Sequence, residues 1–225
     1  PHLVDPAHIW HGRLMVLVWA VIVPLAILIA RFAKILPSQR WPDELDNQVW
    51  WRSHWMLHSA AFGLAILAFY IVGFSGVWVG AGWHVLLGRL MLVGLVVQVL
   101  SGVLRGSKGG PSDPQVDGSL HGDHYSMTLR RRTFEWFHKS LGYTLLLLSV
   151  VAVLTGLWRA NAPHWMWLSL AVWWCVLLSL FLHLQRRGYA VDTYQATWGP
   201  GTDHPGNRLP ASGWGARRLP GKSKL

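Results

Sequence analysis

Five uninterrupted apolar runs constrain the fold of this chain more than any other feature. Each run is close to the roughly 20 residues that an α-helix needs to cross the hydrocarbon core of a bilayer. A buried helix in a soluble core explains one such run, but hardly five in succession. We therefore predict an all-α membrane protein with five transmembrane helices. The runs lie at about 9–30, 53–73, 83–104, 133–158 and 165–184.

Tryptophan marks the ends of these runs. The chain has sixteen Trp among 225 residues, with 52% hydrophobic and only 13% charged residues. Indole rings favour the interface between headgroups and hydrocarbon, so their positions predict two aromatic belts. Trp173 and Trp174 fit a volume-filling role better. The belt residues are Trp10, Trp50, Trp51, Trp55, Trp78, Trp83, Trp136, Trp158, Trp165 and Trp167.

The basic residues predict the orientation. Five spans divide the chain into alternating sides, and one side holds seventeen of the twenty Lys and Arg, counting Lys139 at the start of the fourth span. By the positive-inside rule that side is cytoplasmic and the N-terminus lies outside. We expect an outer N-terminus at 1–8, a transmembrane domain at 9–184 and a basic cytoplasmic tail at 185–225. The net charge of +10 is then a topology signal with affinity for anionic lipid, and no nucleic-acid partner is expected.

Two segments look unlike membrane helices. The loop at 105–132 and the tail after about residue 185 are rich in Gly, Pro, Asp and Ser, so we expect irregular, solvated structure in both. The single cysteine, Cys175, excludes a disulfide within the chain, and there is no CxxCH motif to attach a haem covalently. Because the chain begins at Pro1, we expect that a signal peptide or an extracellular domain preceded it.

The twelve histidines separate by position. Those in loops or termini are expected to be solvated (His2, His121, His124 and His204), and His164 and His183 sit at the edges of the fifth span. One histidine lies near the start of each of the first four spans. An ionisable residue inside a membrane is costly and tends to face the bundle interior. These candidates are His11, His58, His84 and His138.

The alternation of the spans pairs these histidines. The first and third spans start at the outer face, so His11 and His84 share one depth, while His58 and His138 share a depth near the inner face. Haem is held by axial ligands from facing helices, so two histidines at equal depth suit one iron. At 1.5 Å per residue the two tiers are about 20 Å apart.

A glycine follows two of these histidines at the same helical spacing. Gly88 lies one turn after His84, and Gly142 one turn after His138. A residue four positions along lies on the same helix face, so a glycine leaves room for a flat macrocycle. Close helix packing is the competing explanation for a single glycine, but two matched instances favour haem.

Basic residues near the four histidines are candidates for holding haem propionates. They are Arg13 and Arg89 on the outer side, and Arg52 and Lys139 on the inner side. Snorkelling to the interface explains Arg52 and Lys139 equally well. His54 lies one turn before His58 and closer to water, so we assign the ligand role to His58. We expect His54 to be a neighbouring or surface residue. We expect the same of His8, which precedes the candidate ligand His11.

These residues resemble the cytochrome b561 family, in particular the branch found with extracellular DOMON domains and its bacterial relatives. The motifs are "HGRLM", "WMLHS", "HVLLG" and "HKSLGY" in the first four spans. The runs "GDHYSMTLRRRTFEWFHKSLGY" and "RRGYAVDTYQATWGP" also look like bacterial members. The likeness extends from about His11 to Pro200, and the four-histidine pattern is its specific part.

The resemblance implies a four-helix haem-binding bundle plus one peripheral helix. The bundle would carry two non-covalent, bis-histidine haem b groups, with His11 and His84 on one and His58 and His138 on the other. Family members move electrons across membranes, in eukaryotes often from cytoplasmic ascorbate to an outer acceptor such as ferric iron, and commonly form homodimers. This chain departs from the animal and plant forms, because five spans are visible where those have six and no DOMON domain is seen.

The predicted function is transmembrane electron transfer through two b-type haems in a bacterial inner membrane. Quinone, ascorbate and a redox protein are the candidate donors and acceptors. An alternative with the same sequence features is a haem b subunit that anchors a larger respiratory or photosynthetic complex and exchanges electrons with quinone. The third hypothesis is a polytopic membrane protein without haem. On this hypothesis, the four histidines would lie at matched depths by coincidence.

Overall fold

The computed structural model describes residues 5–74, 82–111 and 120–220, and these residues form helices and loops without a strand. Trp78 and His2 lie outside the described residues. Five helical segments are long and apolar enough to cross a membrane, which confirms all five predicted spans. The first runs from Pro6 to Phe32. The others are α3 (Val49–Phe74), α4 (Trp83–Val103), α5 (Leu129–Arg159) and α6 (His164–Arg186).

The first span changes its winding halfway. It begins at α1 (Pro6–Val16), where the Asp5 side chain accepts a hydrogen bond from the Ala7 N–H. It then passes through a π-helical turn, η1 (Leu17–Ile22), into α2 (Val23–Phe32). Such turns insert one extra residue and rotate the helix face that follows. The turn brings Val18, Trp19 and Ala20 into the buried core.

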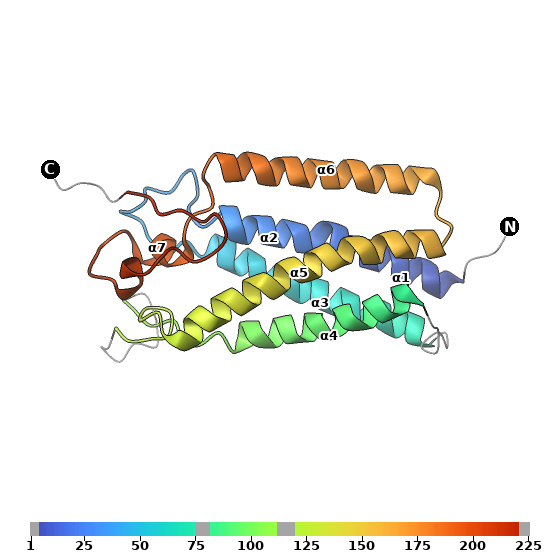
Figure 1. Cartoon of the computed structure of the whole chain (residues 1–225), viewed down its shortest axis with the longest axis horizontal. Coiled ribbons are helices and arrows are strands. Elements are labelled where there is room, and N and C mark those ends of the chain that lie inside the picture. Colours follow the sequence, from blue (N-terminus) through green and yellow to red (C-terminus); the bar gives the residue numbers. More distant parts are fainter. Residues whose placement is uncertain (1–4, 75–81, 112–119, 221–225) are drawn as a thin grey trace.

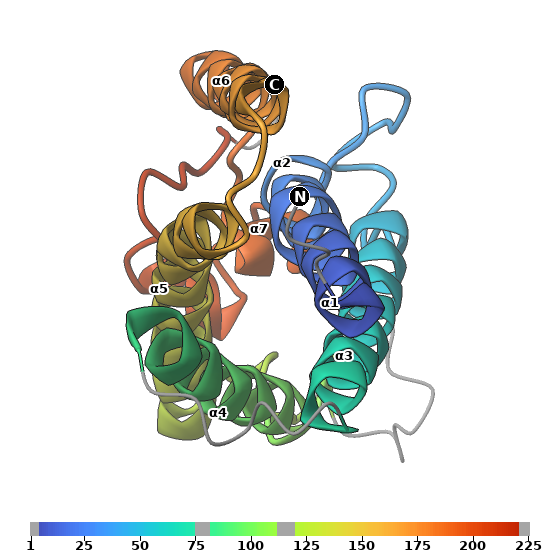
Figure 2. The same cartoon turned by 90° about the vertical axis from the view of Figure 1, so that its right-hand side faces the viewer.

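Two antiparallel helix pairs face each other across the bundle. Figure 2 shows the first span beside α3 on one side and α4 beside α5 on the other. Small residues let the helices approach: Ala61, Ala65 and Ala68 recur along one face of α3 and are almost fully buried. A Cβ on Gly94 of α4 would lie 2.6 Å from Leu145 of α5.

The fifth span, α6, runs along the outside of the bundle (Figures 1 and 2), which confirms the predicted peripheral helix. It is attached by a polar contact within the apolar region. Pro24 has no N–H to offer the Ala20 carbonyl four residues earlier. The Trp173 indole Nε1 donates to that carbonyl instead, at 2.6 Å. Trp173 therefore has a hydrogen-bonding role that a volume-filling residue lacks.

The loop after the first span, the described part of the loop between α4 and α5, and the tail gather at one end of the bundle, where α7 (Thr193–Trp198) lies (Figure 1). We call this the cap, formed by the described residues of 33–48, 105–128 and 187–220. The expectation that the tail is irregular and solvated was wrong over α7, because all six of its residues are buried. The loop expectation was wrong at Gly109, Gly110, His124 and Met127, which are also buried.

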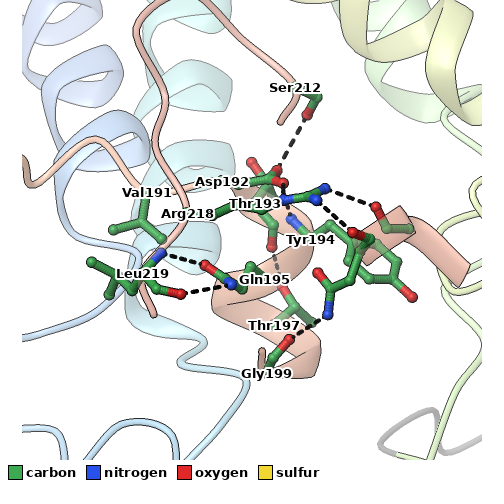
Figure 3. Close-up of polar contacts among 12 residues, drawn as sticks. Val191, Asp192, Thr193, Tyr194, Gln195, Thr197, Gly199, Ser212, Arg218 and Leu219 are labelled. Carbon is green, nitrogen blue, oxygen red and sulfur yellow. Dashed lines mark hydrogen bonds and ion pairs between the residues drawn. The ribbon is translucent and has the colours of Figure 1, made fainter. Parts of the chain in front are cut away.

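A network of hydrogen bonds and an ion pair holds the tail in the cap (Figure 3). The buried Asp192 carboxylate caps α7 through the Tyr194 N–H and accepts from Arg218 Nε at 3.1 Å. The same guanidinium donates to the carbonyls of Asn207 and Gly206, at 2.6 and 2.8 Å. Arg218 thus holds together a part of the tail that shows no helical periodicity in its sequence.

The Trp173 contact gives a first test. Trp173→Phe keeps the ring but removes the donor to Ala20, and interhelical hydrogen bonds in membranes contribute about 0.6–1.7 kcal/mol. We expect thermal unfolding of the protein in detergent to begin at a lower temperature, with earlier loss of α6 contacts. Trp174→Phe removes a neighbouring indole and is the matched control. Equal destabilisation by the two variants would contradict the role of this hydrogen bond.

Candidate functional site

His11 and His84, which we call the first histidine tier, come together from α1 and the start of α4. Their ring centroids are 6.3 Å apart and their planes cross at 86°. His11 Nδ1 lies 3.1 Å from the Ala68 carbonyl oxygen, and His84 Nδ1 lies 3.1 Å from that of Ala152. A carbonyl only accepts hydrogen bonds, so each Nδ1 carries the proton. Each Nε2 therefore keeps a lone pair for a metal.

Three histidines, His54, His58 and His138, form the second histidine tier. The His54 ring centroid lies 6.3 Å from that of His138 and 4.5 Å from that of His58. His138 Nδ1 lies 2.8 Å from Ser101 Oγ on α4. The structure therefore places His54 beside the predicted ligand His138, and His58 beside His54. The pairing of His58 with His138 stays a prediction, and His54 becomes a second candidate.

The helices α3 and α5 repeat one spacing between the tiers. On α3, His54 precedes Ala68, the acceptor for His11, by 14 residues. On α5, His138 precedes Ala152, the acceptor for His84, by 14 residues as well. At 1.5 Å per residue this spacing is about 21 Å. His54 thus occupies on α3 the position that His138 occupies on α5.

The ring separations fit two imidazoles on one metal. Imidazoles that bind an ion from opposite sides, each at about 2.0–2.1 Å, have centroids roughly 6 Å apart. The value of 6.3 Å in both tiers matches that geometry. Within the described part of the chain, no three His, Cys, Asp or Glu gather as a metal site. Paired imidazoles suit an iron whose other ligands belong to a macrocycle.

A cavity of about 550 Å³ adjoins the second tier and extends into the cap. Its volume is typical of sites for organic ligands. All three histidines of the tier line it, and it meets the apolar core at Trp19 and Leu145. The cavity therefore joins a candidate metal position to the cap.

The four basic residues predicted to hold propionates differ in position. Arg13, Arg52 and Arg89 are exposed. Lys139 lines the cavity and binds Glu135 at 2.7 Å. Because Glu135 is almost fully buried, Lys139 is committed to compensating a negative charge.

Three further cations line the cavity, and the sequence interpretation used them only as orientation signals. Lys34 Nζ donates to the Val191 carbonyl at 2.8 Å. The Arg105 guanidinium lies 3.8 Å from the centre of the Trp51 ring. Arg31 donates to neutral oxygens of Tyr143, Gln185 and Trp214. The direct partners of these three residues are thus uncharged. Burial lowers the pKa of Lys34 to about 7, and the charges of Glu135 and Asp192 act on it. The lasting positive charge beside the cavity therefore comes from Arg105 and Arg31. One sequence feature could have identified these three residues, because each follows closely after the end of a predicted span.

The glycines that touch the histidine rings come from the facing helix. A Cβ on Gly156 of α5 would lie 3.0 Å from His84 Cε1, and a Cβ on Gly102 of α4 would lie 3.5 Å from His138 Cε1. The predicted Gly142 lines the cavity, and a Cβ there would lie 3.0 Å from the Gln98 amide. A Cβ on Gly88 would meet only Phe69, at 3.9 Å. Gly88 and Gly142 as macrocycle neighbours stay predictions.

His124 corrects a second expectation, because it is only 6% exposed where we expected a solvated loop residue. Its ring packs against Tyr194 and Trp198 of α7, and its Nε2 is buried without a hydrogen-bond partner. Burial lowers the pKa of His124 to about 3, and the nearby charge of Arg131 adds to the effect. The cap therefore requires a neutral imidazole. His121 in the same loop is exposed, as expected.

The fold and the paired histidines together define an all-helical membrane protein with two candidate metal tiers inside one bundle. The chain is similar to the protein named ferric-chelate reductase 1 of Homo sapiens (29% identity over 149 residues), Bos taurus (29% over 150) and Mus musculus (28% over 149). Each match covers 65% of this chain and 22% of the relative, so the chain spans less than a quarter of their length. No family model and no solved structure matches.

The buried His124 predicts an acid-sensitive cap. Its pKa is about 3 in the fold and ordinarily 6.5, so the unfolded cap takes up the proton first. Stability is therefore full above pH 6.5 and is lost as the pH falls toward 3. We expect His124→Gln to flatten the pH dependence of tail proteolysis in this window. His121→Gln, at an exposed position, is the control, and an unchanged slope in His124→Gln would contradict the role of burial.

Proposed function

We propose that this chain is a membrane cytochrome of the cytochrome b561 type, and that it carries electrons across the bilayer through two non-covalent haem b groups. The haem iron supplies the one-electron chemistry, while the chain holds and orients the two groups. The observation that carries the proposal is the pair of imidazole contacts with equal 6.3 Å ring separations, one in each tier. The similarity to ferric-chelate reductases supports the same class.

The proposed axial ligands are His11 and His84 in the first tier, and His138 with an α3 histidine in the second. The ring separation and the 14-residue repeat favour His54 over His58 as that partner. His58 then packs against the ligand ring, 4.5 Å away.

Cations around the cavity supply the counter-charge for propionates of the second haem. Arg31 and Arg105 have uncharged partners, so a carboxylate adds compensation there without displacing an acid. Lys34 is a weaker candidate, because burial lowers its pKa to about 7. On the first tier, Arg13 and Arg89 remain the proposed candidates.

We propose a bacterial inner membrane with the second tier and the cap at the cytoplasmic face. The three basic-rich segments meet at that end of the bundle (Figure 1), as the positive-inside rule requires. An electron then enters from the cytoplasm and leaves toward an outer acceptor. The names of the relatives make a ferric chelate the first acceptor to assay. Quinone, ascorbate and a redox protein are the electron donors to compare. We propose that the chain acts as a homodimer or as a subunit of a larger complex.

The proposal predicts two haem b groups per chain. We expect a reduced-minus-oxidised optical spectrum of the purified protein to show b-type haem, and a haem assay to give two per polypeptide. His84→Ala is expected to leave only the haem of the second tier, and His138→Ala only the other. A colourless preparation that stays colourless after haem is added would rule out the function.

The choice between His54 and His58 needs variants that keep a ligand. Replacing an axial His by Met raises the reduction potential of a haem. We expect His54→Met to raise the potential of one haem and to change its low-spin electron paramagnetic resonance signal. His58→Met, one turn away in the same cavity, should retain the bis-histidine signal. The reverse result would assign the ligand to His58, as the sequence interpretation did.

A further inference from the structure

Ser101 on α4 is the hydrogen-bond partner of the His138 ring. Its Oγ lies 2.8 Å from His138 Nδ1 and also 2.8 Å from the Gln98 carbonyl oxygen. A hydroxyl has a single proton, and the carbonyl of Gln98 can only accept. The Ser101 proton therefore goes to Gln98, so Ser101 Oγ accepts from His138 Nδ1–H. This assignment leaves the lone pair of His138 on Nε2.

One turn of α4 fixes the position of His138. Besides the Ser101 contact, the Gln98 side-chain amide donates to the His138 main-chain carbonyl at 2.9 Å. Gly102 lies under the ring, where a Cβ would be 3.5 Å from Cε1. Ser101 is thus part of a three-residue clamp that holds both the backbone and the imidazole of a proposed ligand. A merely structural serine would need only its bond to Gln98.

The acceptor for His138 differs in kind from the acceptors in the first tier. His11 and His84 donate to peptide carbonyls, at 3.1 Å each. A peptide carbonyl is a stronger acceptor than a hydroxyl oxygen, and the group that accepts from a ligand imidazole tunes the basicity of that ligand. Thr155 Oγ1 also lies 3.2 Å from His84 Nδ1, but it adds to a carbonyl that is already in place.

We propose that Ser101 is a positioning residue that sets the reduction potential of the second-tier haem through His138 and makes the two haems inequivalent. The inference rests on the proposed function. Hydrogen bonding from Nδ1–H makes the imidazole a stronger electron donor and favours ferric iron. Loss of the acceptor therefore raises the potential of that haem, and a stronger neutral acceptor lowers it.

The test is a potentiometric titration of the purified, haem-loaded protein, followed optically. We expect Ser101→Ala to shift one of two midpoints upward and to leave the other unchanged, with an altered low-spin resonance for one haem only. Ser101→Thr keeps a hydroxyl and should restore the original midpoint. Ser101→Asn, which offers a carbonyl, should shift it downward. Thr155→Ala is the matched control, because His84 keeps the Ala152 carbonyl and its midpoint should not move.

Two unchanged midpoints in both Ser101→Ala and Ser101→Asn would overturn the proposal. If Ser101→Ala loses the second-tier haem, Ser101→Thr and Ser101→Asn decide the matter, since equal midpoints in these two also overturn it. Failure of the proposed function looks different, because the unsubstituted protein then binds no haem and has no midpoint to shift.

Discussion

The structure depends on how a buried imidazole satisfies its ring nitrogens in hydrocarbon. An unpaired polar group there is costly, and in the first tier each Nδ1–H reaches a carbonyl on a neighbouring helix. His11 finds one on α3, while His84 finds one on α5. These contacts join the helices that lie side by side in each half of the bundle (Figure 2). The bonds that fix the rings therefore also fix the packing, and they leave each Nε2 for the space between the two halves.

The spans and the tiers were accessible from the sequence for a simple reason. Helix length and the start of each span set the depth of a side chain, so His11 and His84 were expected at one depth, and their ring centroids lie 6.3 Å apart. Depth leaves the choice between His54 and His58 open, because residues one turn apart share a face. Only the facing helix distinguishes them. The same limit explains Gly102 and Gly156, which accommodate rings from another helix, whereas the interpretation looked for glycines on the ligand's own helix.

The sequence did not predict the buried structure of the cap, because no local sequence pattern indicates it. Helix α7 has six residues, too few for an apolar periodicity, and its sequence is polar enough to suggest a solvated tail. Its burial comes from contacts with distant segments. Arg218 binds Asp192 (Figure 3), and the His124 ring packs against Tyr194. A buried charge that is fully hydrogen-bonded is a tertiary feature. The same segments bring Lys34 and Arg105 to the cavity, so the charge of the site was also hidden.

The two ends of the bundle differ in charge and in the hydrogen-bond acceptors of their histidines. Both differences would raise the reduction potential of a centre at the second tier. Cations such as Arg31 and Arg105 beside the second tier favour the reduced state of a centre placed there, because reduction adds negative charge. The hydroxyl acceptor on His138 acts in the same sense, since it is weaker than the carbonyls that serve His11 and His84. On the proposed function, both effects give the cytoplasmic haem the higher potential. Outward transfer is then uphill between the haems. An inside-negative membrane potential offsets part of this cost, because an electron that crosses the whole membrane gains about 2.3 kcal/mol for each 100 mV.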